Sequence, residues 1–282
     1  MPEKTILITG ASSGIGEACA LYLDRLGMRV FASVRKPLDA ARLASQASSR
    51  LTPLILDVAD EASIQAALTT VRAALGENGL DGLVNNAGSF TGGPLEHLPL
   101  AALRQQFEVN VLGQMAVVQA FLPLLRQNHG RIVFVGSTSG FLATPLLGPY
   151  AASKFAIRAL ADALRNELNA AQVSVSLIEV GKVNTPIWGK ALALVDEMKG
   201  VLPGDAVGYY TPMIEATVAR ANRRGQSGIA PLKVAEAIHR VLIVDRPKPK
   251  YLIGADAHLQ ALIVWLTPAG LLDRLIRWQM GI

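Results

Sequence analysis

Residues 5–16 read Thr-Ile-Leu-Ile-Thr-Gly-Ala-Ser-Ser-Gly-Ile-Gly, and this stretch decides the fold. Its first four residues are an apolar run, which is typical of a short strand buried on both faces of a sheet. Its second half holds three glycines, and residues 15–26 continue with the spacing of an amphipathic helix. A strand, a glycine loop and a helix in immediate succession predict the first unit of a parallel α/β sheet.

The same alternation continues along most of the chain. Further strands are predicted at residues 29–33, 54–56, 82–85, 131–135, 173–178 and 251–253, and helices at residues 62–75, 101–125, 150–168 and 231–244. Strand–helix–strand repetition implies parallel pairing with right-handed crossovers. We therefore predict a doubly wound parallel sheet (a Rossmann fold) of about seven strands, with helices on both faces and a ligand at the C-terminal strand ends.

The predicted organisation is one catalytic domain, residues 1–256, followed by an apolar helical tail, residues 257–282. Residues 185–228 interrupt the alternation with glycines, prolines and large side chains, so they are predicted to form a substrate-binding loop or lid. The chain has 282 residues, of which 51% are hydrophobic and 17% charged. That composition supplies enough apolar material for one large core.

Composition also excludes several classes of function. The net charge of +5 comes from scattered basic residues without a nucleic-acid-binding motif, so no nucleic-acid partner is expected. The single cysteine, Cys19, excludes an internal disulfide and fits a reducing compartment. The N-terminus has no signal-peptide pattern, which favours the cytoplasm. The four histidines are scattered without ligand spacing, so no metal is expected.

The glycine loop predicts a bound dinucleotide. Glycines let the backbone approach a pyrophosphate, and the helix that follows offers unpaired N–H groups and a positive dipole end. A turn of small residues without a ligand is the alternative, but the position between the first strand and the first helix favours the cofactor. The predicted contacts are Gly10, Ser12, Ser13, Gly14, Ile15 and Gly16.

The spacing Gly-x-x-x-Gly-x-Gly resembles the glycine motif of the short-chain dehydrogenase/reductase family. Over residues 4–255 further motifs match this family in order: Asn85-Asn86-Ala87-Gly88, Asn110-Val-Leu-Gly, Ser137 thirteen residues before Tyr150, and Tyr150-x-x-x-Lys154. The resemblance implies an NAD(P)-dependent oxidoreductase that forms a homodimer or homotetramer, through the predicted helices at residues 101–125 and 150–168.

Arg35 favours a phosphorylated cofactor. The second strand is followed by Arg35 and Lys36, whereas an acidic residue there would bond the ribose hydroxyls of NAD. A guanidinium pairs well with phosphate oxygens, so NADP(H) is predicted over NAD(H), and a solvated basic pair is the alternative. The resemblance adds Asp57 and Val58 near the adenine, although Asp57 could instead cap the helix that begins near Asp60. It also adds the cofactor contacts Asn86, Ala87, Gly88, Tyr150, Lys154, Val183 and Thr185.

Tyr150 and Lys154 lie four residues apart on a predicted helix and therefore share one face. The ammonium stabilises the phenolate, which helps the tyrosine to exchange a proton at neutral pH. By resemblance, Tyr150 protonates the carbonyl oxygen while a hydride passes to the carbonyl carbon, and oxidation is the reverse. Ser137 bonds the same oxygen, Lys154 bonds the nicotinamide ribose, and Asn110 holds a water beside Lys154.

Residues 246–254 resemble the segment before the last strand in the hydroxysteroid and retinol dehydrogenase branch. This likeness predicts a steroid, a retinoid or another bulky apolar alcohol or ketone as substrate. The predicted substrate contacts are Ser137, Tyr150, Phe141, Leu147 and Trp188. Alternatives are a small ketone or an acyl-chain carbonyl as substrate, a catalytically idle NADP-binding sensor or scaffold, and a sugar-nucleotide epimerase, which the glycine spacing disfavours.

Two features depart from the simplest expectation. Val180 stands where the family usually has a proline, which puts the rigidity of the following loop in question. The tail carries leucines, Trp265 and Trp278, with Arg274 and Arg277 near its end. A helix packed over the pocket or against another subunit is the first interpretation of the tail, and peripheral attachment to a membrane surface is the alternative.

Overall fold

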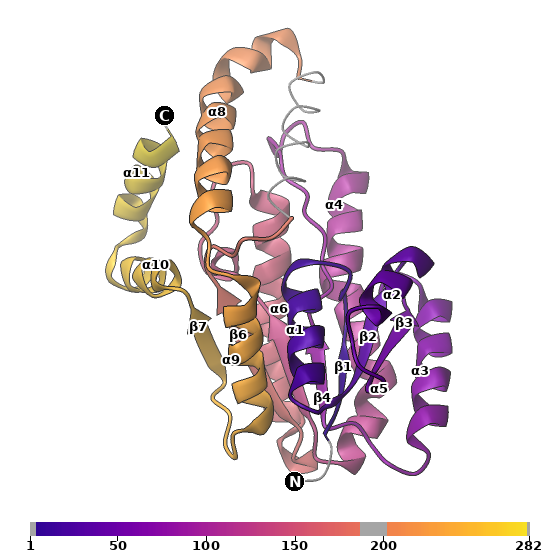
Figure 1. The fold of residues 1–282 in the computed structure, drawn as a ribbon. Helices are drawn as coiled ribbons and strands as arrows, with labels where there is room; N and C mark the ends of the chain where they lie inside the picture. Colours follow the sequence, from indigo (N-terminus) through magenta and orange to yellow (C-terminus); the bar gives the residue numbers. More distant parts are fainter. Residues whose placement is uncertain (1–3, 187–201, 281–282) are drawn as a thin grey trace.

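The computed structural model describes residues 4–186 and 202–280, without the side chains of residues 205 and 220–227. Within this part of the chain, seven parallel strands form one sheet in the order β3-β2-β1-β4-β5-β6-β7 (Figure 1). The strands are β1 (Thr5–Ile8), β2 (Arg29–Val34), β3 (Leu51–Ile55), β4 (Gly82–Asn85), β5 (Arg131–Val135), β6 (Ser174–Val180) and β7 (Lys250–Ile253). The predicted doubly wound parallel sheet is confirmed.

Helices cover both faces of the sheet, and the five inner strands, β2, β1, β4, β5 and β6, are buried on both sides as a result. On one face lie α3 (Glu61–Leu75), α5 (Gly113–Gln127) and α6 (Gly148–Glu167); on the other lie α1 (Gly14–Arg25), α2 (Pro37–Ala44) and α9 (Pro231–Ile243). Leu7 and Phe134 point into the first core, whereas Ile6, Ile8 and Val133 point into the second. Side chains alternate between faces along a strand, so two cores require a continuous apolar run.

The helix predicted at residues 101–125 is interrupted. It consists of α4 (Leu100–Phe107), a π-helical turn η1 (Glu108–Leu112) and α5. A π-turn inserts one extra residue into a helix and often marks a functional site. Here the turn carries Asn110, which is fully buried. Leu100–Gln127 is also the one helix in the described residues that is long and apolar enough to cross a membrane, but half of its 18-residue apolar window is buried, as in a core helix.

Two differences from the prediction involve proline. β3 begins at Leu51 rather than residue 54, and Pro53 lies within it. A proline is tolerated in β3 because this strand is at the edge of the sheet, where one row of backbone groups needs no partner. The short helix α2, which begins at Pro37, was not predicted.

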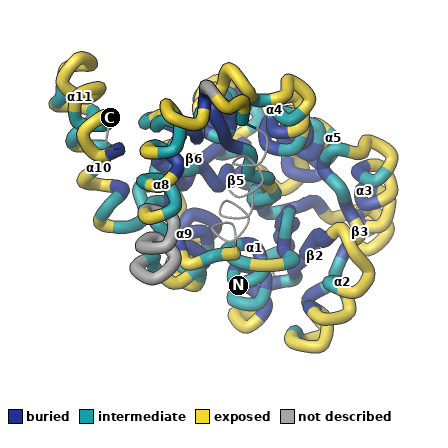
Figure 2. Tube along the Cα trace, turned by 90° about the horizontal axis from the view of Figure 1, so that it is seen from above, coloured by how far each residue is buried: buried dark blue, intermediate teal, exposed yellow. Residues whose placement is uncertain are grey.

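The segment predicted as a lid contains a long helix, α8 (Gly204–Ser227), with Pro212 inside it. The tail forms α10 (Ala255–Leu266) and α11 (Ala269–Met280), and α11 lies beside α8 (Figure 1). Figure 2 shows α10 and α11 at the margin of the molecule, with much of their length exposed. α10 begins at Ala255, so it crosses the predicted boundary at residue 256; the division into a domain and a tail stays a prediction.

Candidate active site

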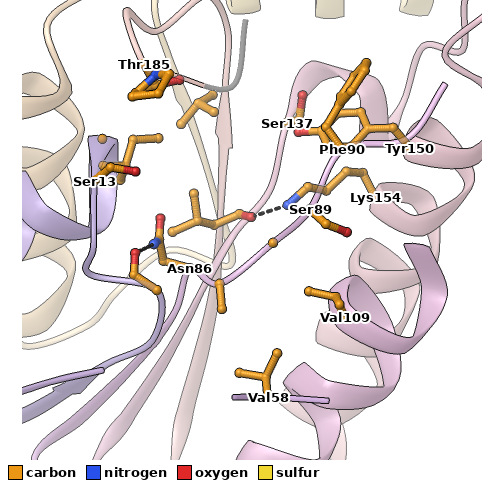
Figure 3. Close-up of a pocket in the computed structure, with 18 of the residues that line it drawn as sticks. Ser13, Val58, Asn86, Ser89, Phe90, Val109, Ser137, Tyr150, Lys154 and Thr185 are labelled. Carbon is orange, nitrogen blue, oxygen red and sulfur yellow. Dashed lines mark hydrogen bonds between the residues drawn. The ribbon is translucent and has the colours of Figure 1, made fainter. Parts of the chain in front are cut away.

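A pocket of about 500 Å³ lies at the C-terminal ends of the strands. Its walls are formed by the segments that follow β1, β2, β3, β4, β5 and β6 and by the first turns of α6. The predicted site residues that line it are Gly10, Ser12, Ser13, Gly14, Ile15, Arg35, Asp57, Val58, Asn86, Ala87, Gly88, Ser137, Leu147, Tyr150, Lys154, Val183 and Thr185. Ser13 and Thr185 lie on one side of the pocket, and Ser137, Tyr150 and Lys154 lie on the other (Figure 3).

Four predicted residues are not brought to this lining. Gly16 and Asn110 lie behind it and support it. The ring of Phe141 instead packs under the guanidinium of Arg158, 5.6 Å from the ring centre. Trp188 lies outside the described residues. The substrate roles of Phe141 and Trp188 therefore stay predictions.

The glycine loop is shaped by close backbone approaches. Gly10 has a φ of +70°, and a Cβ there would lie 2.7 Å from the Cα of Ala87. A Cβ at Gly16 would lie 2.2 Å from the carbonyl oxygen of Gly10. The amide of Asn86 donates to the carbonyl oxygens of Thr9, at 2.9 Å, and Gly10, at 3.0 Å. Asn86 therefore connects the loop after β4 to the glycine loop and holds both in place.

Thr9 completes this connection, although its position in the sequence did not predict this role. Its hydroxyl oxygen accepts hydrogen bonds from the backbone N–H groups of Asn86 and Ala87, both at 3.0 Å. Ser33 adds a second support, because its hydroxyl accepts from the N–H of Gly10 at 3.2 Å. The donors and acceptors of these hydrogen bonds lie far apart in the sequence, so no local sequence pattern predicts them.

The start of α1 faces the pocket with the features expected of an anion site. Ser13 is the N-cap residue, and its side chain makes no capping hydrogen bond with the residues that the structure describes. The first N–H groups of a helix need partners from outside the helix, and its dipole favours a negative charge there. Glu17, in the first turn, is paired with Arg42, which also donates to the carbonyl of Ser12 at 2.6 Å. Arg42 thus offsets the one acidic group of this turn.

Arg35 and Asp57 lie along the pocket wall at the ends of β2 and β3. Arg35 is exposed and makes no hydrogen bond or ion pair with another described residue, so its guanidinium is available to a ligand. The carboxylate of Asp57 accepts from the N–H of Ala59 at 3.1 Å. Asp60, not Asp57, caps α3, because its carboxylate accepts from the N–H of Ala62. The capping interpretation of Asp57 is therefore wrong.

Lys154 connects α6 to the end of β5. Its ammonium donates to the carbonyl oxygen of Val135 at 2.9 Å and lies 5.8 Å from the centre of the Tyr150 ring. The side chain is buried, and this burial lowers the pKa of Lys154 to about 8. Val135 is followed after one residue by Ser137, whose hydroxyl accepts from the N–H of Ser139 at 3.1 Å. Lys154 therefore links α6, which carries Tyr150, to the end of β5, which is followed by Ser137.

The ring of Tyr150 has a neighbour that the sequence did not reveal. The ring of Phe90, in the loop after β4, lies 5.3 Å away with an interplanar angle of 45°. Phe90 lines the same pocket and is drawn against Tyr150 in Figure 3. Tilted aromatic pairs at this distance attract one another, so Phe90 helps to orient the phenol ring.

Asn110 is a buried support of the catalytic helix. Its amide oxygen accepts from the N–H of Ser89 at 2.7 Å, and its amide nitrogen donates to the carbonyl of Ser89 and to the hydroxyl of Ser153, both at 3.1 Å. Ser153 directly precedes Lys154. The π-turn thus links the loop after β4 to α6. The predicted water beside Lys154 stays a prediction.

Comparison with known proteins finds dehydrogenases and reductases that are similar to this chain in sequence or in structure. Residues 4–194 match the family model described as short chain dehydrogenase. The chain is 33% identical over 275 residues to an NADPH-dependent 3-dehydrocapnine reductase of Ornithobacterium rhinotracheale, covering 95% of this chain and 94% of that protein. It is 35% identical over 283 residues to retinol dehydrogenase 5 of Mus musculus, covering 98% and 88%. A short-chain dehydrogenase structure from Streptomyces avermitilis superimposes with a TM-score of 0.76 at 26% identity, covering 97% and 98% of the two chains.

Proposed function

The chain belongs to the short-chain dehydrogenase/reductase family of oxidoreductases, and on that premise we propose that it transfers a hydride between NADP(H) and an alcohol or ketone of a bulky apolar substrate. One observation carries the proposal: Ser137, Tyr150 and Lys154 line the same pocket as the glycine loop. Two relatives, an NADPH-dependent reductase and a retinol dehydrogenase, support the choice of cofactor and substrate class.

The residues of the pocket fit a phosphorylated dinucleotide. Gly10 and Gly14 line the pocket and have positive φ, and a side chain on Gly10 would collide with Ala87, so the bend of this loop requires glycine. The start of α1 suits the pyrophosphate. Arg35, unpaired within the described residues, suits a 2′-phosphate, and Asp57 with Val58 lies beside it for the adenosine.

The protein's part in the reaction is positioning and proton transfer. The nicotinamide, when bound, supplies or removes the hydride. Tyr150 gives a proton to the carbonyl oxygen during reduction and takes it back during oxidation. Ser137 hydrogen-bonds the same oxygen and stabilises the charge that develops on it. Lys154 stabilises the phenolate of Tyr150 by its positive charge and exchanges protons readily, because burial lowers its pKa to about 8.

A panel of carbonyl compounds tests the function as a whole. Steroid and retinoid ketones and aldehydes, small ketones and acyl-chain carbonyls are each incubated with the protein while the absorbance of NADPH is followed. We expect turnover with at least one bulky apolar compound and a lower kcat/KM for the small ketones. Preference for small ketones would contradict the proposed substrate class, and no turnover with any compound, in either direction, would favour an idle cofactor-binding protein.

Removal of the Arg35 side chain should change the choice of cofactor. In the variant Arg35→Ala we expect the Kd for NADPH to rise about tenfold, or ~1.4 kcal/mol, because a charge-assisted phosphate contact is lost. The Kd for NADH should stay within about twofold, since NADH has no 2′-phosphate. Fluorescence titration of both cofactors measures this.

The control for this experiment is Arg25→Ala, since Arg25 lies in the last turn of α1, at the opposite end of the helix from the glycine loop. It should bind both cofactors like the wild type. Tighter binding of NADH than of NADPH by the wild type would overturn the assignment to NADP.

Because the chain belongs to a family whose resemblance implies homo-oligomers, we also propose that the protein is a homo-oligomer. We further propose that the tail attaches the protein to a membrane surface. On α10, Leu259, Leu262 and Leu266 are exposed at helical spacing, where a helix in water would show polar side chains. Trp265 and Trp278 are exposed by 81% and 76%. Aromatic and leucine side chains with arginines nearby suit the boundary between lipid chains and anionic headgroups.

Flotation with lipid vesicles tests the tail. We call the exposed residues Leu259, Leu262, Trp265 and Leu266 of α10 the apolar stripe. We expect the wild type to float with phosphatidylserine-containing vesicles. The double variant Leu262→Glu/Trp265→Glu should stay in the dense fraction, because a charge that must enter the lipid is costly. Leu38→Glu, at a leucine that is 80% exposed on α2, is the matched control and should float. The glutamates could instead lower the molar mass of the protein assembly, measured by light scattering, without affecting flotation. In that case the apolar stripe is a contact between two copies of the chain and the membrane proposal is wrong.

A further inference from the structure

The loop after β6 is held by a carboxylate from α10, the helix that begins the C-terminal extension. The side chain of Asp256 accepts a hydrogen bond from the backbone N–H of Lys182 at 2.8 Å. A Cβ at Gly181 would lie 2.2 Å from the nearer carboxylate oxygen, and a Cβ at Gly254 would lie 2.6 Å from it. The carboxylate therefore occupies the space that two glycines leave open. We propose that Asp256 is a positioning residue of the cofactor site, which it serves through this loop.

The loop that Asp256 holds is a wall of the pocket. Val180, Gly181, Val183, Thr185 and Pro186 all line it. Thr185 packs against the glycine loop, since a Cβ at Gly14 would lie 3.2 Å from its methyl carbon. This wall faces Ser137 and Tyr150, so it borders the nicotinamide end of the proposed cofactor (Figure 3). The inference thus rests on the proposed function.

The hydrogen bond between Lys182 and Asp256 lies just after the position at which the resemblance predicts a proline. Val180 replaces that proline, ends β6 and is buried in the sheet. The N–H of Gly181 then donates to the carbonyl of Ile253 at 2.9 Å, and the N–H of Lys182 donates to Asp256. A proline restricts a loop through its ring, whereas here two hydrogen bonds to the segment after residue 252 restrict the loop.

α10 also reaches the other side of the reaction centre. It contacts η2 (Thr138–Gly140), the 3-10 turn that directly follows Ser137. α10 therefore contacts the turn that follows Ser137 and also restrains the loop after β6, which forms a wall of the pocket. The rival explanation is that Asp256 merely stabilises the start of α10, where an acidic side chain in the first turn suits the helix dipole. The experiment must separate these two roles.

Two ligands separate them, NADPH and adenosine 2′,5′-bisphosphate, because the second carries the 2′-phosphate but no nicotinamide. In the variant Asp256→Ala we expect the Kd for NADPH to rise about tenfold and the Kd for the bisphosphate to stay within about twofold. Asp256→Asn keeps an oxygen that accepts from Lys182 and should restore most of the NADPH affinity. Asp273→Ala, an exposed acidic residue of α11, is the control and should bind both ligands normally.

A double-mutant cycle tests the contact itself. The three atoms nearest to a Cβ at Gly181 all belong to the carboxylate of Asp256. Gly181→Ala should therefore weaken NADPH binding about tenfold in the wild type and at most about twofold in the Asp256→Ala background. Strictly additive effects would overturn the inference, as would equal weakening of both ligands by Asp256→Ala. If the wild type bound neither ligand, the proposed function would fail first, whatever the variants did.

Discussion

Tyr150→Phe should lower kcat by about 10³-fold while the Kd for NADPH stays within about twofold. The substitution removes the one hydroxyl that is proposed to give and take the proton. It keeps the aromatic ring, and with it the contact to Phe90 and the placement of the Lys154 ammonium over the ring. Steady-state turnover and fluorescence titration, on whichever substrate the panel identifies, measure the two quantities separately.

Tyr251→Phe provides the control, because Tyr251 also bears a bonded hydroxyl, which accepts from the N–H of Lys248 at 2.8 Å, but lies outside the pocket lining. Its turnover should match that of the wild type. Equal turnover by Tyr150→Phe and the wild type across the whole panel would contradict the proton-transfer role and the enzyme assignment with it.

Gly16→Ala should lower the free energy of unfolding by about 3 kcal/mol and abolish NADPH binding. The new Cβ would lie 2.2 Å from the carbonyl oxygen of Gly10 and 2.5 Å from the amide nitrogen of Asn86. Neither atom can yield cheaply, because Asn86 and Gly10 are hydrogen-bonded to each other. α1 must therefore move away from β1, and the glycine loop opens. Urea denaturation measures the stability change.

Gly208→Ala is the matched control for this change. Gly208 lies in α8, and a Cβ there meets no atom within 4 Å. Alanine should leave stability unchanged or raise it by up to about 1 kcal/mol, as expected for a glycine inside a helix. A loss of less than about 1 kcal/mol in Gly16→Ala would show that the approach of α1 to β1 is softer than the structure indicates.

Local patterns predicted most of the sheet, because a strand buried on both faces must be apolar throughout. β1, β4 and β5 have the predicted bounds. The errors occur where tertiary context overrides a local preference. Pro53 is accommodated at a sheet edge, and Pro212 lies within a helix whose residue Ile214 packs against Leu146. A sequence read one window at a time does not show whether a strand is central or at the edge.

The site divides in the same way. Residues inside one motif, such as Gly10 and Gly14 or Tyr150 and Lys154, could be predicted because the motif fixes their spacing on one loop or one helix face. Phe90 and Asp256 could not, because their roles depend on contacts with residues about 60 or more positions away.

The strand order decides what an unfinished chain would expose. In the complete sheet β5 is paired on one side with β4 and on the other with β6, which begins only at Ser174. A polypeptide that stops short of that residue, during translation or after proteolytic cleavage, would present Ile132, Val133 and Phe134 on an open edge, although all three are fully buried in the whole chain. Open apolar edges pair with other chains and aggregate. The nascent protein should therefore need chaperone protection until the ribosome has delivered β6.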